Sequence, residues 1–372
     1  MTVLAVIGVL ALLIFVHELG HFMAARLQKI HVNRFSIGFG PILWKFQGPE
    51  TEYALRAIPL GGFVGFPDDD PESDIPANDP DLLRNRPVLD RAIVISAGVI
   101  ANMIFAYTVS VAQFGLLGIP EPVNGVYIPQ VVSGSPADLA GIERKDIVIE
   151  ANGQRLDGAT APASTGANGG EAAAVDGVDQ QLISIIHSSP NEPVNLTIQR
   201  KNEELQVAVT PEVSPRTNDA VIGIGLSTMA PRRIKNPMEI LSLAAQQFQF
   251  QTQQVATGML SLFTNFSEMS GQVGSPVKIV EQGAKLSAEN IGFLFPFAAI
   301  ISINLAIINI LPLPALDGGQ LAFLIIEAVR GKPLPMRLQE SVMQTGIFLL
   351  LGLGIFLIIR DTTQLEVLQN LR

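Results

Sequence analysis

The first 26 residues constrain this chain more than any other stretch. Sixteen uncharged residues run directly into His17-Glu18-Leu19-Gly20-His21, and the helical pattern continues to Arg26. Apolar residues cover all faces of the predicted helix rather than one stripe, which argues against a helix in a soluble core. At about 1.5 Å per residue the stretch would be roughly 39 Å long, more than the ~30 Å hydrocarbon thickness of a membrane. We therefore expect a membrane-spanning helix that contains ionisable residues.

The ionisable residues have the spacing of a metal site. His17 and His21 are four residues apart, so both imidazoles leave one helix face about one turn apart and can hold one Zn²⁺. Glu18 beside them can act on a water at the metal. Chance is a poor alternative, because the chain has only four histidines and two of them fall here. The motif would lie about 24 Å along the helix from Met1, near the far side of the membrane, where ionisable groups are costly and usually functional.

Composition excludes several classes of protein. The 372 residues are 48% hydrophobic, with several long apolar runs, which indicates an integral membrane protein with soluble parts. The net charge of −10 comes without a basic stripe, so we expect no nucleic-acid partner. Because the chain has no cysteine, a zinc site must use histidine and carboxylate ligands. The N-terminus lacks a basic n-region and leads into the histidine motif, so we expect it to be retained rather than cleaved as a signal peptide.

Three later apolar runs predict further spans, at 92–118, 291–311 and 342–359. In the run at 92–118, Gly98 and Asn102 lie one turn apart on one face. A small residue permits close helix approach and a buried asparagine offers interhelical hydrogen bonds. Helix packing alone and a role near the metal site are equally good interpretations of this pair.

The run at 291–311 ends in Pro312-Leu313-Pro314-Ala315-Leu316-Asp317-Gly318-Gly319. The prolines stop the helix, and the glycines allow the backbone to approach another group closely. Asp317 is therefore a carboxylate at the edge of an apolar run and a candidate for the third metal ligand. The alternative is that Asp317 caps the helix that follows it. Beside the paired histidines we favour the metal.

The segment after the first span changes character. Residues 30–66 alternate polar and apolar residues between Gly-Pro and Gly-Gly turns, which predicts short strands and hairpins. Residues 67–91 are acidic and proline-rich, as in a solvated cytoplasmic loop. His31 is a weak candidate for a further zinc ligand, since nothing fixes it near His21. Asp68, Asp69 and Asp70 lack the spacing of a Ca²⁺ loop.

Residues 123–230 form a soluble segment rather than a membrane-like one. The order of strand, short helix, strand, helix, hairpin and a closing strand at 221–226 predicts an α+β domain, interrupted by a flexible Gly/Ala-rich insert at 157–178. The phrase Gly134-Ser135-Pro136-Ala137, with the Ala-Gly-Ile, Asp-Ile-Val and Asn-Gly phrases that follow it, resembles a PDZ domain. Such domains bind extended peptides at a sheet edge, so a peptide ligand is expected. His187 is interpreted as a solvent-facing or packed histidine.

Lysine and arginine near the ends of the spans indicate the orientation. They lie on one side of the membrane if both termini and the PDZ-like domain lie on the other. This places the zinc site toward the cytoplasmic side of the inner or plasma membrane and the PDZ-like domain outside the cytoplasm. The residues concerned are Arg26, Lys29, Arg34, Arg84, Arg86, Arg91, Arg330, Lys332 and Arg337.

The two distant motifs together resemble the site-2 protease family, in particular the bacterial RseP type of intramembrane zinc metalloprotease. Residues 34–40, 58–63 and 274–277 extend the resemblance over almost the whole chain. It implies that His17, His21 and Asp317 are zinc ligands and that Glu18 is the catalytic acid/base. It also implies that Asn304 and Asn309 assist near the substrate backbone and that residues 34–66 form a membrane-reentrant β element.

The resemblance further implies cleavage of the transmembrane segments of single-span proteins, such as anti-sigma factors or remnant signal peptides. Two rivals are a membrane scaffold with a structural zinc and a zinc transporter. The scaffold is disfavoured because a structural zinc would give Glu18 no function. The transporter is disfavoured because the sequence shows no repeated halves.

The resulting prediction is an α-helical polytopic membrane protein with about four transmembrane helices, a membrane-associated β-hairpin element and an inserted α+β PDZ-like domain. Its segments are 1–29 with the histidine motif, 30–66, 67–91, 92–118, 123–230, an amphipathic helix and linker at 236–290, 291–319 with the aspartate, and 320–372.

Overall fold

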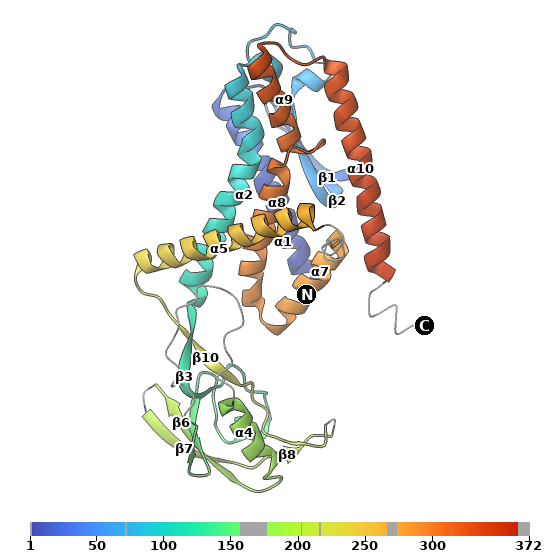
Figure 1. The fold of residues 1–372 in the computed structure, drawn as a ribbon. Coiled ribbons are helices and arrows are strands. Elements are labelled where there is room, and N and C mark those ends of the chain that lie inside the picture. The colour runs from blue at the N-terminus through green and yellow to red at the C-terminus, as the bar shows by residue number, and fades with distance from the viewer. Residues whose placement is uncertain are drawn as a thin grey trace. The chain divides into compact units, whose positions relative to one another are not determined.

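The computed structural model describes residues 2–70, 73–156, 177–201, 203–215, 217–265 and 274–363. It divides into two compact units, one joining residues 1–113 to 241–372 and the other containing 114–240. Within the described residues, four helical stretches are long and apolar enough to cross a membrane (Figure 1). They are Thr2–Leu27 (α1), Val88–Leu117 (α2), Ile291–Ile310, which comprises η4 (Ile291–Phe293) and α8 (Leu294–Ile310), and Met336–Thr363 (α10).

α1 shows why such a uniformly apolar sequence forms a spanning helix. Only Val6, Leu13, His17 and Ala25 are buried in the structure. Most of the remaining residues are apolar and are half-buried or exposed. A helix satisfies its own backbone hydrogen bonds, so a surface of this kind is stable in lipid and unfavourable in water.

The helix boundaries differ from those expected from hydropathy. α2 begins at Val88, directly after Pro87, and α10 begins at Met336. Both first turns contain charged residues, such as Arg91 and Arg337, which lower the hydropathy but are well tolerated in a helix. The predicted starts at 92 and 342 are therefore late by four and six residues.

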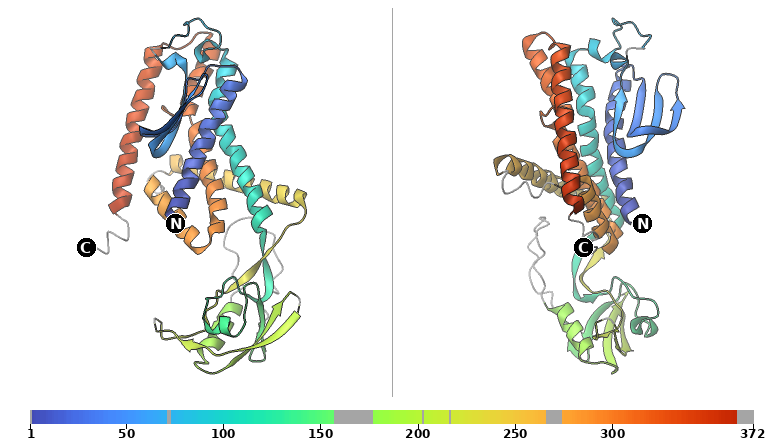
Figure 2. Two further views of the ribbon diagram at one scale, coloured as in Figure 1. Left: turned by 180° about the vertical axis from the view of Figure 1, so that it is seen from behind. Right: turned by 90° about the vertical axis from the view of Figure 1, so that its right-hand side faces the viewer.

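A small folded sheet, made of β1 (Arg34–Gln47) and β2 (Glu52–Gly65), packs beside α1 (Figure 2). Its aromatic anchor is Phe35, whose ring lies 5.2 Å from that of Phe22 and 6.0 Å from that of Phe15. The start of β1 lies between the two ends of β2. Residues 42–47 of β1 run antiparallel to residues 52–56 of β2. Residues 34–37 of β1 pair on one side with residues 52–55 of β2 in parallel and on the other side with residues 62–65 in antiparallel orientation.

The acidic segment between β2 and α2 is folded rather than simply solvated. It contains η1 (Pro67–Asp69) and η2 (Leu83–Asn85). Asp68 pairs with Arg84 at 3.2 Å, and other acidic residues of the segment pair with side chains near the end of α1. These ion pairs hold the segment against the first helix and sheet.

The unit of residues 114–240 has the predicted α+β composition. Leu182 and Ile186 of its longer helix are buried in one core with Val148 and Ile198 of its central strands. The main sheet has the order β10-β3-β4-β6-β7, with β5 paired to β4, and β8 pairs with β9. The bounds are β3 Ile119–Tyr127, α3 Pro136–Leu139, β4 Ile147–Ala151, β5 Gln154–Arg155, α4 Val178–His187, β6 Val194–Arg200, β7 Glu203–Val209, β8 Glu212–Val213, β9 Ala220–Val221 and β10 Ser227–Arg232.

Two details of this unit differ from expectation. The closing strand is β10 rather than 221–226, because Gly223 adopts a φ of +78° and a Cβ there would overlap the side chain of Ser135. The chain therefore turns at Gly223 before it rejoins the sheet. Of the predicted insert, residues 157–176 lie outside the described residues, whereas Val178 already begins α4.

A buried ion pair braces the same unit. Asp146 is almost completely buried, and its two oxygens accept hydrogen bonds from Nε and Nη2 of Arg200 at 2.8 and 2.7 Å. These bonds raise the pKa of the Arg200 guanidinium above its ordinary value. The pairing explains why an aspartate is tolerated directly before the buried strand β4.

The remaining helices among the described residues are α5 (Pro237–Thr264), α7 (Pro276–Glu289) and α9 (Asp317–Arg330). Ser275 is the N-cap of α7, and its hydroxyl accepts a hydrogen bond from the backbone N–H of Lys278. The N–H of Ser275 itself donates to Asp361 Oδ2 at 2.6 Å. The end of α10 is thereby joined to the start of α7.

Candidate metal centre

α1 presents both histidines of the motif on one face. The Nε2 atoms of His17 and His21 lie 3.2 Å apart, and their ring centroids are separated by 4.8 Å. Four residues along an α-helix amount to slightly more than one turn, so this proximity follows from the sequence spacing. Both rings are largely enclosed by neighbouring helices.

Asp317 reaches the same point from the far end of the chain. α8 ends at Ile310, and a short turn leads into α9, whose first residue is Asp317. A Cβ at Gly318 would overlap the carbonyl oxygen of Ile310, so the reversal needs glycine. The N-cap is Leu316. The interpretation of Asp317 as the N-cap is therefore wrong, and its carboxylate faces the histidines instead.

The three candidate ligand atoms form a compact triangle. Asp317 Oδ2 lies 3.2 Å from Nε2 of His17 and 3.4 Å from Nε2 of His21. In a tetrahedral site with metal–ligand distances of about 2.1 Å, neighbouring ligand atoms are about 3.4 Å apart. Asp317 Oδ2 is buried and accepts no hydrogen bond, so its lone pairs are available to a cation. The donor set, two imidazoles and one carboxylate, fits Zn²⁺ with one coordination position left open.

α2 holds the histidine rings in the orientation that a metal requires. Nδ1 of His21 lies 2.8 Å from the carbonyl oxygen of Val94, which can only accept. Nδ1 therefore carries the proton and Nε2 keeps its lone pair. Nδ1 of His17 lies 3.2 Å from the amide nitrogen of Asn102, whose Oδ1 is buried without a partner. Turning this amide by 180° lets Oδ1 accept from Nδ1–H and gives His17 the same tautomer.

Gly98 explains how α2 comes so close. A Cβ at Gly98 would overlap Nε2 of His21 and lie 2.8 Å from Cε1 of His17. Any larger residue would displace both rings. The sequence left packing and a role at the centre equally open for Gly98 and Asn102, and both residues contact the histidines.

Glu18 lies between α1 and the sheet. A Cβ added to Gly62 of β2 would lie 2.8 Å from Cγ and 3.4 Å from Cδ of Glu18. Glu18 thus follows His17 directly in the chain, and its side chain lies against Gly62 of the sheet. This places an acid/base group within reach of whatever binds between the sheet and the histidines.

The two predicted substrate-assisting asparagines differ in position. The amide nitrogen of Asn309 lies 3.5 Å from Nε2 of His17. Asn304 donates to the carbonyl of Ile300 at 3.1 Å, one turn earlier in its own helix. The structure brings Asn309 to the centre, and the role of Asn304 stays a prediction.

A second group of metal-binding residue types lies at the end of α1. The side chains of His31, Asp79 and Asp81 have ligand atoms within 4.8 Å of one another, and His31 Nε2 is 3.7 Å from Asp79 Oδ1. Here the carboxylates already have partners. Asp79 Oδ1 accepts from the backbone N–H of Asp81 at 2.8 Å, and Asp81 pairs with Arg86 at 3.0 Å. We interpret this cluster as a set of structural contacts that hold the acidic segment against the end of α1.

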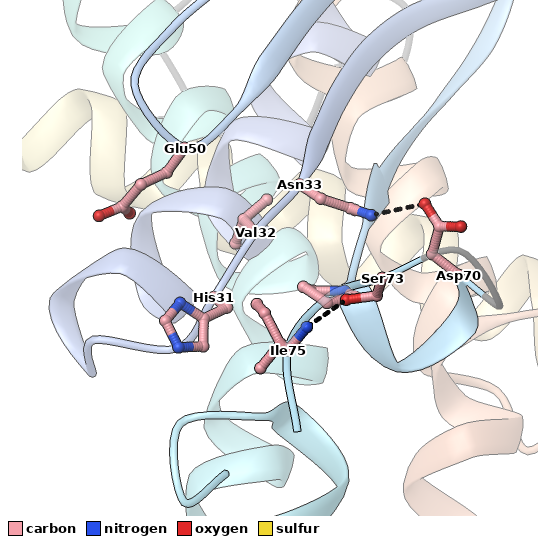
Figure 3. Close-up of a pocket in the computed structure, with 8 residues that line it drawn as sticks. His31, Val32, Asn33, Glu50, Asp70, Ser73 and Ile75 are labelled. Carbon is pink, nitrogen blue, oxygen red and sulfur yellow. Dashed lines mark hydrogen bonds between the residues drawn. The ribbon is translucent and has the colours of Figure 1, made fainter. Parts of the chain in front are cut away.

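A pocket of about 390 Å³ opens beside His31 (Figure 3). Its polar groups bond to one another: Asn33 Nδ2 donates to Asp70 Oδ2 at 3.2 Å, and the N–H of Ile75 approaches Ser73 Oγ at 3.4 Å. The pocket is therefore part of the folded acidic segment and is separate from the triangle of candidate ligands.

Sequence reasoning missed two groups at the centre. The carbonyl of Val94 is a backbone group, so no residue type signals it. Gly62 was noted as part of a turn and of the stretch 58–63 that carries the resemblance, but not as the residue whose missing side chain makes room for Glu18. Neither contact has a spacing that a single sequence could reveal.

Comparison with known proteins gives a consistent result. The model of a family described as peptidase family M50 matches residues 5–353. A protein of Nostoc sp., whose name places it among the zinc metalloproteases, is 55% identical over 98% of this chain and 97% of its own length. The chloroplastic membrane metalloprotease ARASP of Arabidopsis thaliana is 43% identical over 100% of this chain and 80% of its own. The regulator of sigma-W protease RasP of Bacillus subtilis is 27% identical over 98% and 99%.

A solved structure, the PDZ domain of the SdrC-like protein from Listeria monocytogenes, is 18% identical, covers 29% of this chain and 93% of that chain, and has a TM-score of 0.22. The family match and the relatives cover nearly the whole chain, including both distant motifs. The chain belongs to peptidase family M50 and is a metalloprotease of the site-2 protease type.

Proposed function

We propose that this metalloprotease binds one Zn²⁺ through His17, His21 and Asp317 and cleaves transmembrane segments of single-span membrane proteins. The observation that carries the proposal is the triangle of three ligand atoms, with sides of 3.2, 3.2 and 3.4 Å, at the meeting point of apolar helices. Peptide bonds that reach this point must come from within the membrane.

The chemistry divides between the metal and the chain. A zinc ion held by His17, His21 and Asp317 would supply a Lewis acid for the scissile carbonyl and would lower the pKa of a water toward neutral pH. Glu18 accepts a proton from this water as the water attacks and passes it to the leaving amine. Asn309, 3.5 Å from a zinc-binding imidazole nitrogen, is positioned to donate a hydrogen bond to the substrate backbone.

A substrate helix must unwind before it is cut, because its carbonyls are hydrogen-bonded within the helix. We propose that the unwound segment pairs with an edge of the β1–β2 sheet. Support comes from Gly62, which belongs to the outer stretch 62–65 of β2 and lies against Glu18. Leu43, Trp44 and Phe46 are exposed apolar residues of the same sheet, as expected for an element that dips into lipid.

The proposed location is the cell (inner or plasma) membrane, with the active site toward the cytoplasmic side. The excess of lysine and arginine after α1, before α2 and between α9 and α10 supports this orientation. It places the α+β unit outside the cytoplasm. We propose that this unit is PDZ-like, binds a peptide and admits only substrates already trimmed outside the membrane.

The role of the α+β unit is tested by deleting residues 123–225. If the unit is a filter, cleavage of an untrimmed single-span substrate should increase. Unchanged or reduced cleavage at normal expression would contradict the filter.

The protease proposal is tested with Glu18→Gln. The purified variant should keep one zinc per chain and lose cleavage of a tagged single-span substrate in proteoliposomes by about 10²–10⁴-fold. Asn304→Ala and Asn309→Ala test the asparagines in the same assay. Retained cleavage by Glu18→Gln would favour a scaffold with a structural zinc, and loss of zinc would mean that Glu18 itself is a ligand.

A further inference from the structure

A partly buried ion pair joins two helices that carry different parts of the candidate metal centre. Nη1 of Arg91 lies 3.1 Å from Oε2 of Glu327, and Nη2 lies 2.5 Å from Oε1. The side chains are only 16% and 14% exposed. Arg91 belongs to the first turn of α2, and Glu327 belongs to the last turns of α9, which lies beside α2 in Figure 1.

The geometry of this pair restricts how the two helices can move. The two parallel hydrogen bonds of a guanidinium and a carboxylate fix orientation as well as distance. Because both groups are largely removed from water, separating them would leave an uncompensated charge near the membrane, which is strongly unfavourable. The pair therefore acts as a rigid clasp between α2 and α9.

Each clasped helix presents groups to the histidines. α2 carries the Val94 carbonyl, Gly98 and Asn102, which contact the rings of His17 and His21. α9 carries the candidate ligand Asp317, ten residues or about 15 Å before Glu327. The clasp thus connects the helix that orients the imidazoles to the helix that supplies the carboxylate.

Apart from Leu324 and Glu327, the residues in the distal half of α9 are exposed. Its described buried residues are Gly318, Gly319 and Leu324, and the first two belong to the turn beside Asp317. Ile325 and Val329, on either side of Glu327, are 64% and 84% exposed. Without the clasp, α9 would be anchored mainly at one end.

We propose that Arg91 and Glu327 are positioning residues, which hold α9 against α2 so that Asp317 Oδ2 stays within coordination distance of both histidines. This inference rests on the proposed role of Asp317 as a zinc ligand. The two residues touch no reacting atom, and they act through the helix that bears the carboxylate.

The first experiment measures the position of α9 without any metal. The chain has no cysteine, so Leu89→Cys in α2 and Val329→Cys in α9, both at exposed positions, accept spin labels without background. In metal-free protein in detergent, the label-to-label distance distribution should broaden when Arg91→Met or Glu327→Gln is added. Arg91→Lys, which keeps the charge but loses the planar fork, should give an intermediate width.

The second experiment measures zinc affinity by chelator competition on the same folded variants, selected by size-exclusion chromatography. Arg91→Met and Glu327→Gln should bind zinc about 10- to 100-fold more weakly, as for other groups that orient ligands. The double variant Arg91→Glu/Glu327→Arg should restore both the affinity and the narrow distance distribution. Arg84→Met, which breaks an ion pair with Asp68 inside the acidic segment, is the matched control and should change neither.

Unchanged distance distributions in Arg91→Met and Glu327→Gln would overturn the clasp. Broadened distributions with wild-type zinc affinity would overturn its positioning role, since a merely structural pair would behave this way. A wild-type protein that binds no zinc would instead contradict the proposed function, and the metal-free distances distinguish that failure from failure of the clasp.

Discussion

Among the described residues, two clusters contain both histidine and aspartate, and only one of them has the properties of a metal site. In the first, Asp317 Oδ2 accepts no hydrogen bond and lies 3.2 and 3.4 Å from Nε2 of His17 and His21, while α2 contacts the Nδ1 side of both rings. In the second, around His31, the carboxylates of Asp79 and Asp81 already bond to a backbone N–H and an arginine. Residue types alone do not distinguish the two clusters. The difference lies in whether the ligand atoms already have partners.

The largest expected effect comes from removing one ligand of the first cluster. His17→Ala should weaken zinc binding on the order of 10³-fold, because about a third of the protein's bonds to the metal are lost. Zinc content by mass spectrometry and chelator competition check this. His31→Ala is the control from the second cluster and should keep the wild-type zinc content. If both variants lost the same amount of zinc, the conclusion that only the first cluster binds metal would be wrong.

A comparable effect is expected from one methyl group on α2. Gly98→Ala places a Cβ into both imidazole rings, and the overpacking should lower zinc affinity by about 10²-fold. Gly8→Ala, on α1, meets nothing within 4 Å and should leave zinc affinity unchanged. If Gly98→Ala bound zinc like the wild type, the close approach of α2 to the rings would be wrong.

The next effect tests the tautomer of His17. Asn102→Ala removes the group behind Nδ1 and should weaken zinc binding by about 10- to 100-fold. Asn102→Asp keeps an acceptor for Nδ1–H and should retain most of the affinity. The opposite order of the two variants in chelator competition would mean that Asn102 donates rather than accepts.

The smallest effect is expected in the second cluster. Asp79→Asn weakens a partly exposed contact with His31, so it should lower the free energy of unfolding by no more than about 1 kcal/mol. Thermal unfolding in detergent measures this, with zinc content followed in the same samples. If the wild type bound two zinc ions and this variant only one, our interpretation of the cluster as purely structural contacts would be contradicted.

Much of this architecture was accessible from the sequence because membrane helices are governed by simple rules. The four apolar spans and the one-turn spacing of His17 and His21 follow from hydropathy and helical period. The ends of the spans were less accessible, since charged residues such as Arg91 lower hydropathy without ending a helix. The closing strand of the α+β unit was misplaced because Gly223 turns the chain, and that φ value is not encoded in the residue type.

For the candidate metal centre, the sequence could indicate candidate ligand side chains but not the backbone and packing contacts around them. Asp317 was identified as a candidate ligand because prolines and glycines mark an interrupted helix. The alternative, that Asp317 is the N-cap of the following helix, could be excluded only with coordinates. Gly98 and Asn102 could not be assigned to packing or to the centre, because one sequence does not show which face of α2 meets α1. The Val94 carbonyl and the Arg91–Glu327 pair depend on tertiary packing alone.

The central claim is that His17 Nε2, His21 Nε2 and Asp317 Oδ2 hold one zinc ion between apolar helices. X-ray absorption at the zinc edge of purified Glu18→Gln protein tests it most directly. We expect one zinc per chain with nitrogen and oxygen neighbours at about 2.0–2.1 Å and a signal from about two imidazoles, one of which should disappear in Glu18→Gln/His21→Ala. A zinc environment unchanged by that second substitution, or protein without zinc, would contradict it.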